Sequence, residues 1–130
     1  MEKYIRVKEN GNIDVVEVSA DRWLDDVYNA INCDCIQIVK TTPHYGGMVL
    51  VIDDNGKLKE HKLNAMASVL YGQGMRDYIA GDVLLGWQGL RNGEPDIVEL
   101  PEGLQAHMWE YLHDLKEFIK QDLGNDMFKW

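Results

Sequence analysis

Basic residues are scarce in this sequence. The 130 residues include 13 lysines and arginines against 22 aspartates and glutamates, which gives a formal net charge of −9 with neutral histidines. The densest basic stretch, residues 57–62, is interrupted by Glu60 and follows Asp53 and Asp54. Because nonspecific binding to DNA or RNA draws its affinity from basic groups that displace counterions, we expect no direct nucleic-acid binding.

Cysteines and long apolar stretches are also few. Cys33 and Cys35 are too few for a zinc site, and their spacing disfavours a disulfide, so we expect reduced thiols. The apolar run at residues 49–52 is far shorter than a membrane span, and the first residues carry no apolar signal-peptide core. These features predict a cytoplasmic protein with no membrane association.

Motifs of known catalytic and cofactor sites are missing as well. There is no HExxH, GxSxG or P-loop pattern, and His107 and His113 fall on different faces of a helix. Residues 53–56 resemble a calcium loop, but Val51 then occupies the first ligand position, where a carboxylate is required. The glycine-rich residues 72–74 imitate a dinucleotide-binding fingerprint but follow a predicted helix rather than a strand. We therefore expect no metal site, no cofactor and no catalytic residue.

What the chain has is an average globular composition, with 45% hydrophobic and 27% charged residues, which is enough apolar side chain for one core. The patterning predicts a single α+β domain over residues 1–130, with a mixed, mainly antiparallel sheet of five to six strands, two larger helices and one short helix. Six strands are expected, at residues 4–7, 13–18, 35–39, 48–52, 57–62 and 82–87, and residues 97–98 are a candidate for a short additional one.

Local signals set the boundaries of several elements. Asn10 and Gly11 favour a hairpin turn between the first two strands. Residues 53–56 favour a second such turn, which leads into the strand at 57–62. Ser19 is placed to cap the first helix by accepting a backbone N–H.

The loop at residues 41–47 is the predicted ligand-binding surface. Gly46 and Gly47 allow a ligand or partner to approach the backbone, and His44 and Tyr45 can stack on it or form hydrogen bonds. A plain connection between two strands is the alternative interpretation of this loop.

Three further residues complete the candidate ligand-binding set. Asn64 either caps the helix expected at residues 65–71 or reads the edge of a ligand with its amide. Asp82 either ties the turn at residues 80–81 or faces a ligand. Arg76 is one of the few cations that can meet an anionic group.

The last predicted helix, at about residues 101–123, and the aromatic tail at residues 127–130 form a candidate contact surface. Trp109, on this helix, is expected in the core or in a groove. A disordered end has no reason to be so aromatic, so the tail either packs back on the domain or docks on a second copy of the chain. A homo-oligomer formed through this helix and tail is one option.

Four short motifs follow one another along the chain: CDCIQIV at residues 33–39, DDNGKL at 53–58, LNAMA at 63–67 and DYIAGDVL at 77–84. Together they resemble a small domain-of-unknown-function family of phage and of Gram-positive mobile elements, over about residues 4–88. Where that family tends to have glutamate in its third strand, this chain has Gln37, so a role that needs this charge does not carry over. The resemblance implies a phage-like setting and an α+β fold, and it supplies no reaction.

We therefore expect a non-enzymatic phage or mobile-element accessory protein of the bacterial host cytoplasm, which binds a small, nucleotide-like ligand or a host protein in counter-defence. One alternative is an acidic DNA mimic that inhibits a host DNA-binding enzyme, and another is a small hydrolase or transferase. A continuous acidic ridge along the last helix favours mimicry, whereas a cationic cleft built from Lys40, Lys62, Arg76 or Arg91 favours ligand capture. Converging titratable groups with shifted pKa values favour an enzyme.

Overall fold

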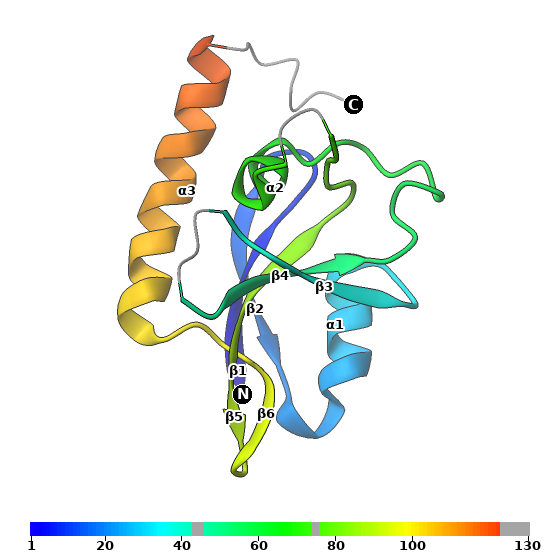
Figure 1. Ribbon diagram of the computed structural model, residues 1–130, viewed down its shortest axis with the longest axis vertical. Coiled ribbons are helices and arrows are strands. Elements are labelled where there is room, and N and C mark those ends of the chain that lie inside the picture. Colours follow the sequence, from blue (N-terminus) through cyan, green and yellow to red (C-terminus); the bar gives the residue numbers. More distant parts are fainter. Residues whose placement is uncertain (43–45, 74–75, 123–130) are drawn as a thin grey trace.

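The computed structural model describes residues 1–42, 46–73 and 76–122 of the chain. Within them, six strands form one sheet and three α-helices cover its faces, which confirms the predicted α+β class (Figure 1). No helix in these ranges is long and apolar enough to cross a bilayer. The elements are β1 (Glu2–Val7), β2 (Ile13–Val18), the short 3₁₀ helix η1 (Ala20–Arg22), α1 (Trp23–Ile31), β3 (Ile36–Lys40), β4 (Met48–Asp53), α2 (Ala65–Tyr71), β5 (Val83–Arg91), β6 (Glu94–Val98) and α3 (Glu102–Asp122).

The sheet is antiparallel at every described pairing, and its strand order is β2-β1-β5-β4-β3. β5, with nine residues, pairs with β4 along one edge and is long enough to take two neighbours along the other. β1 pairs with its residues 83–85, and β6 pairs with its residues 87–91. β2 and β3 are therefore the outer strands of this path.

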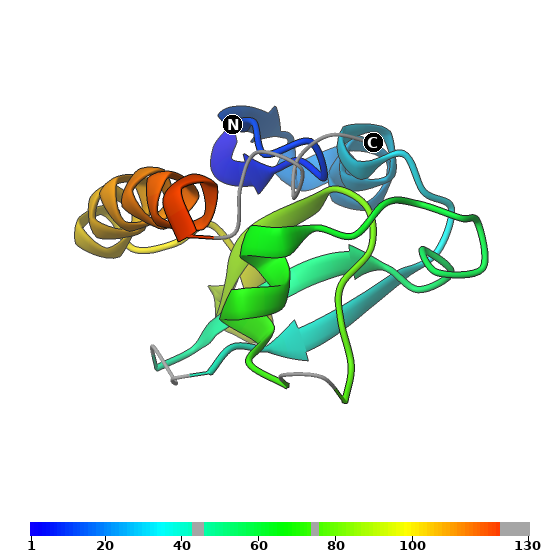
Figure 2. The ribbon, with the colours of Figure 1, turned by 90° about the horizontal axis from the view of Figure 1, so that it is seen from above.

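The helices divide between the two faces of the sheet, with α2 and α3 on one face and α1 on the other (Figure 2). Side chains alternate along each strand, so Leu50 belongs to the core under α2 and α3 while Val51 belongs to the core under α1. Because helices cover both faces, all six residues of β4 are buried. This double cover explains why β4 is continuously apolar rather than alternating.

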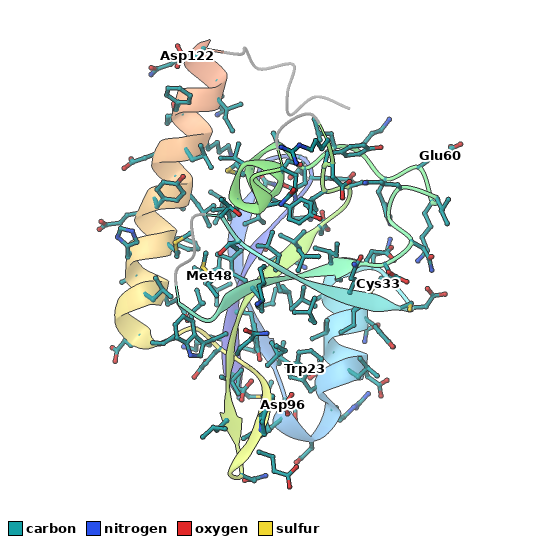
Figure 3. All side chains as sticks on the ribbon, in the orientation of Figure 1. Trp23, Cys33, Met48, Glu60, Asp96 and Asp122 are labelled. Atoms are coloured by element: carbon teal, nitrogen blue, oxygen red, sulfur yellow. The ribbon has the colours of Figure 1, made fainter. Side chains whose placement is uncertain are left out.

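A hydrogen bond between two aromatic side chains joins α1 to the sheet, in addition to apolar packing. Trp23 points from the start of α1 toward the sheet (Figure 3), and its Nε1 donates to the Tyr4 hydroxyl over 2.9 Å. That hydroxyl donates in turn to the Glu2 carboxylate over 2.7 Å. Burial raises the pKa of Tyr4, so the phenol keeps the proton that this chain of bonds requires.

The strand predicted at residues 57–62 is wrong, because this segment forms successive turns. Its backbone is bonded locally: the Lys59 N–H donates to the Asn55 carbonyl and the His61 N–H donates to the Gly56 carbonyl. Glu60 has a φ of 59°, which a strand does not allow. Both edges of β4 are already occupied, by β3 and β5, so no place remains for a returning strand.

The ends of the helices confirm one of the predicted capping residues and contradict the other. Asn64 caps α2, and its side chain accepts the Ala67 N–H, as predicted. α1 ends at Asn32, which has a left-handed conformation. Ser19 precedes η1 but makes no capping bond through its side chain, so that prediction is wrong. Its backbone N–H donates to the Asp26 carboxylate instead, over 2.8 Å.

Candidate functional site

Within the loop predicted to bind a ligand, His44 and Tyr45 lie outside the described residues, and the two glycines after them lie against β5. Gly46 has a φ of 64°, and a Cβ atom there would lie 2.9 Å from Cη2 of Trp87. The Gly47 carbonyl accepts the Gln88 N–H over 2.8 Å. Glycine is needed at position 46 for close packing on Trp87, whatever the loop binds.

Asn64 is 1% exposed, and its side chain is engaged inside the fold. Its Nδ2 donates to the carbonyls of Val7 and Gly81, over 2.9 Å each, and its Oδ1 accepts the Ala67 N–H. One amide thus ties together β1, the start of α2 and the turn before β5. We name this arrangement the Asn64 corner. A ligand contact at Asn64 stays a prediction, and no exposed polar atom supports it.

Asp82 and Arg76 lie in different surroundings. The Asp82 carboxylate accepts the Glu9 N–H over 2.9 Å, and so holds the end of β1 against the start of β5. Arg76 is exposed at the surface. None of the described members of the predicted ligand-binding set lines the cavity beside α3 or the cavity beside the turns that follow β4.

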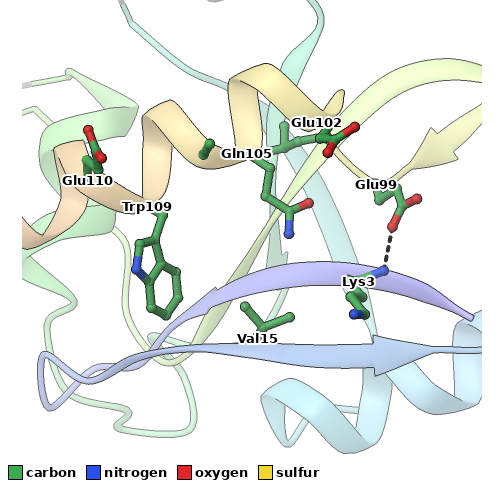
Figure 4. A pocket seen from close by; sticks show the side chains of 9 residues that line it. Lys3, Val15, Glu99, Glu102, Gln105, Trp109 and Glu110 are labelled. Carbon is green, nitrogen blue, oxygen red and sulfur yellow. Dashed lines mark hydrogen bonds between the residues drawn. The ribbon is translucent and has the colours of Figure 1, made fainter.

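A cavity of about 550 Å³ lies between α3 and the β1–β2 hairpin (Figure 4). We call it the α3–β2 groove. Trp109 and Gln105 point from α3 toward the hairpin, and Val15 of β2 lies below them (Figure 4). The full lining comprises Lys3, Val15, Glu99, Leu100, Glu102, Gln105, Ala106, Trp109 and Glu110.

The groove exists because α3 is anchored at other points along its length. Its deeper residues, Met108 and Leu112, are fully buried in the core. Leu100, just before the helix, is also buried, and the neighbouring Glu99 carboxylate accepts the Lys3 N–H. Between these anchors Ala106 is too short to fill the space above the hairpin, so the groove stays open.

The groove combines exposed apolar surface with an acidic rim. Val15 is 43% exposed and Trp109 is 36% exposed, and both line the same cavity. Three glutamates line the groove beside a single lysine, Lys3. Glu110 lies toward one end of α3 and Glu102 toward the other, and neither carboxylate points toward the hairpin (Figure 4). Such a surface favours a ligand that is apolar in the middle and positively charged toward its ends.

Sequence reasoning named Trp109 as a core or groove residue but left it out of the candidate site. Its signal was its position: Trp109 follows Met108 and lies off the buried stripe of α3, where a large aromatic side chain must meet solvent or a partner. Val15 had no such signal, since alternation along β2 cannot tell a face under a helix from a face beside a cavity.

A second cavity, of about 280 Å³, lies beside the turns that follow β4. Lys57 forms an ion pair with Asp77 and lies 4.4 Å from the centre of the Tyr78 ring. The hydrogen bond from Lys57 lowers the pKa of Asp77, and Tyr71 also donates to this carboxylate. These charged groups are thus already paired with one another.

Asp53, at the end of β4, is the buried carboxylate nearest to this cavity. It lies 3.2 Å from Lys59 Nζ and 3.2 Å from His61 Nε2, and it accepts the Asn55 N–H. Burial and the charge of Asp53 raise the pKa of the Cys33 thiol, so the thiolate that nucleophilic attack requires is disfavoured. Among the described residues, no three His, Cys, Asp or Glu side chains are placed to hold a metal ion.

The distribution of charge bears on two functions that the sequence left open, DNA mimicry and capture of a nucleotide-like ligand. Glu110, Asp114 and Glu117 form a row along one side of α3, but Lys120 lies 3.8 Å from Glu117, which leaves a short and partly neutralised ridge. Arg91 is bound by Glu2 and Asp96. Both cavities have more carboxylates than lysines along their linings, so neither is the cationic cleft that a nucleotide requires.

Residues 1–114 match the family model of DUF3846, described as a domain of unknown function. The match covers most of the chain, which therefore belongs to this family. It confirms the resemblance to a domain of unknown function and extends it beyond residue 88 into α3. No curated protein and no solved structure matches the chain significantly.

Proposed function

We propose that this member of the DUF3846 family is a non-enzymatic binding protein whose α3–β2 groove holds a segment of a host protein. The segment carries an apolar side chain between positively charged ones. A phage or mobile-element origin, action in the bacterial cytoplasm and a role in counter-defence belong to the same proposal, and the sequence resemblance is their only support.

The observation that carries the proposal is the pairing of Val15 and Trp109 in one acidic groove. Single exposed apolar side chains are ordinary on protein surfaces, but these two line the same cavity. Removing apolar surface from water contributes roughly 25 cal/mol per Å² to a complex, before the costs of association are subtracted. The glutamates of the rim add an attraction that selects basic partners over acidic ones.

The ligand class follows from the sign of the charges. A nucleotide-like ligand would bring phosphates toward Glu99, Glu102 and Glu110, where like charges repel it. A basic protein segment meets the same carboxylates as counter-ions. Of the two ligand classes expected from the sequence, the groove therefore favours the protein.

The states of the Asp53 carboxylate and the Cys33 thiol, the groups best suited to catalysis, support the non-enzymatic part of the proposal. Asp53 is bound by Lys59, His61 and a backbone N–H, which hold the turns after β4 in place. The raised pKa of Cys33 keeps its thiol protonated. A small hydrolase or transferase needs an activated nucleophile, and this thiol is not one.

Two basic probe peptides test the proposal. In the first, lysine, leucine and lysine occupy every second position and threonine fills the positions between them, which favours an extended chain. The second places the same leucine and lysines on one side of an alanine-rich helix. Calorimetric titration should show that at least one binds with a dissociation constant on the order of 10–100 µM, whereas glutamate-for-lysine versions do not bind.

A matched pair of variants ties any binding to the groove. Trp109→Ala should weaken it at least about tenfold, because aromatic side chains in grooves dominate such interfaces. Phe118→Ala removes another exposed aromatic side chain of α3 that does not line the groove, and should leave the affinity unchanged. Failure of both basic peptides to bind, or equal behaviour of the two variants, would contradict the proposed function.

A further inference from the structure

We infer that the partner segment binds as an extended strand added to the free edge of β2, with alternate side chains entering the α3–β2 groove. This inference rests on the proposed function and specifies the conformation and the sequence pattern of the partner. Its basis is the position of β2 in the sheet, which is independent of the cavity itself.

β2 is an outer strand of the sheet. It pairs with β1 along all six residues, and no other described strand pairs with it. Five of its six residues are at least partly exposed, and Val18 alone is buried. An outer strand presents backbone N–H and C=O groups without a neighbouring strand, and adding a peptide strand is a common way of satisfying them.

The pairing with β1 shows which side chains of β2 face the groove. Val15 lies opposite Ile5, which belongs to the core under α2 and α3, and Glu17 lies opposite Lys3, which lines the groove. Opposite residues of paired strands share a face, so Val15 and Glu17 both face α3. A strand added beside β2 would place every second side chain on this same face.

The spacing of the groove defines the sequence pattern of that strand. A side chain next to Val15 extends the apolar surface that Val15 and Trp109 share, and it is therefore apolar. The next side chains on the same face are about 7 Å away in each direction. One of these side chains lies next to Glu17 of β2, and both lie near the glutamates that line the groove, so they are basic. The pattern is basic–x–apolar–x–basic.

Charge also decides between a foreign segment and a second copy of this chain. Pairing β2 with its own copy would bring Glu17 of both copies to one seam, whereas Asp14 is already paired with Arg6. Like charges across neighbouring strands are destabilising, whereas lysines or arginines in the added strand neutralise Glu17. The structure thus favours a basic segment of another protein.

Backbone methylation of the extended probe peptide tests strand addition without changing the protein. Every second N–H of an added strand points toward β2, and the remaining ones point away. Two versions are made, one methylated on the amides of the lysines and leucine and one on the amides of the threonines. We expect one version to bind at least tenfold more weakly than the other, because it has lost the bonds to β2.

The outcomes separate this inference from the proposed function. Equal affinities of the two methylated peptides, or equal losses, overturn strand addition while groove binding stands. Binding of the helical probe alone has the same meaning. If neither unmodified probe binds, the proposed function and strand addition both fail. A selective loss in one methylated version, together with slower hydrogen exchange of the β2 amides, supports strand addition.

Discussion

The Asn64 corner and the α3–β2 groove show opposite uses of conspicuous side chains. Asn64 is a polar residue that resembles a binding residue in the sequence, yet its amide bonds to three backbone groups and is closed off from solvent. Trp109 and Val15 resemble core residues, yet they remain exposed in a cavity. In this protein the buried amide supports the fold, and the exposed apolar surface remains for a partner.

The largest effect is expected at the corner. Asn64→Ala removes the cap of α2 and the hydrogen bonds that the side chain donates to the carbonyls of Val7 and Gly81. We expect a loss of about 3 kcal/mol in the free energy of unfolding, measured by urea titration. Asn29→Ala, at an exposed position on α1, should change it by less than about 0.5 kcal/mol.

The same variant also tests whether the Asn64 corner takes part in peptide binding. Where Asn64→Ala is still folded, its affinity for the basic peptides should equal that of the unchanged protein. A selective loss of peptide binding would mean that the corner contributes to a binding site after all.

The next largest effect is expected from reversing charge at the rim of the groove. Glu102→Lys combined with Glu110→Lys should weaken the basic peptides at least about tenfold and improve binding of the acidic ones. Asp114→Lys combined with Glu117→Lys makes the same change of charge on α3 outside the groove. If both double variants lose affinity equally, the net charge of the protein and not the groove selects the partner.

Salt should weaken peptide binding at the groove but not the stability contribution of the Asn64 corner, and this effect is smaller than that of the charge reversals. Raising the salt concentration from about 0.1 M to about 1 M shortens the Debye length from about 10 Å to about 3 Å. Binding of the basic peptides should weaken roughly fivefold, because the attraction to the rim is exposed to solvent. The destabilisation caused by Asn64→Ala should stay the same, since neutral buried hydrogen bonds are not screened. Salt-independent peptide binding would argue against an electrostatic role for the rim.

The smallest effect concerns Asp14, which is next to Val15 but faces the α1 side of the sheet. Arg6 donates two hydrogen bonds to Asp14, over 2.9 and 2.6 Å, and these lower the pKa of the carboxyl. A lowered pKa stabilises the fold above the unfolded value of about 4, and this contribution is lost as the pH falls through the folded value.

Because the Asp14 side chain is 44% exposed, the contribution is only a few tenths of a kcal/mol. Asp14→Asn should remove it at neutral pH and make the acid limb of the stability curve shallower, as measured by urea titration across pH. Peptide affinity should not change, and a change would show that binding involves the opposite face of the sheet.

Elements specified by local sequence were predictable, and elements that depend on distant pairing were not. The apolar run of β4 and the capping residue of α2 are local signals, and both predictions are confirmed. Residues 57–62 have the polarity of an outer strand, but β5 arrives from further along the chain and takes the place beside β4. The groove has the same origin, since it depends on α3 coming to lie beside the β1–β2 hairpin, which is distant in the sequence.

The most direct test of the groove as a binding site is a chemical-shift map of the isotope-labelled protein titrated with the extended basic peptide. If the α3–β2 groove binds the peptide, the largest shifts fall on the Trp109 indole N–H, on the backbone amide of Val15 and on its neighbours in β2 and α3. Shifts centred on the cleft around Lys57 and Asp77, or spread evenly over the acidic surface, would contradict it.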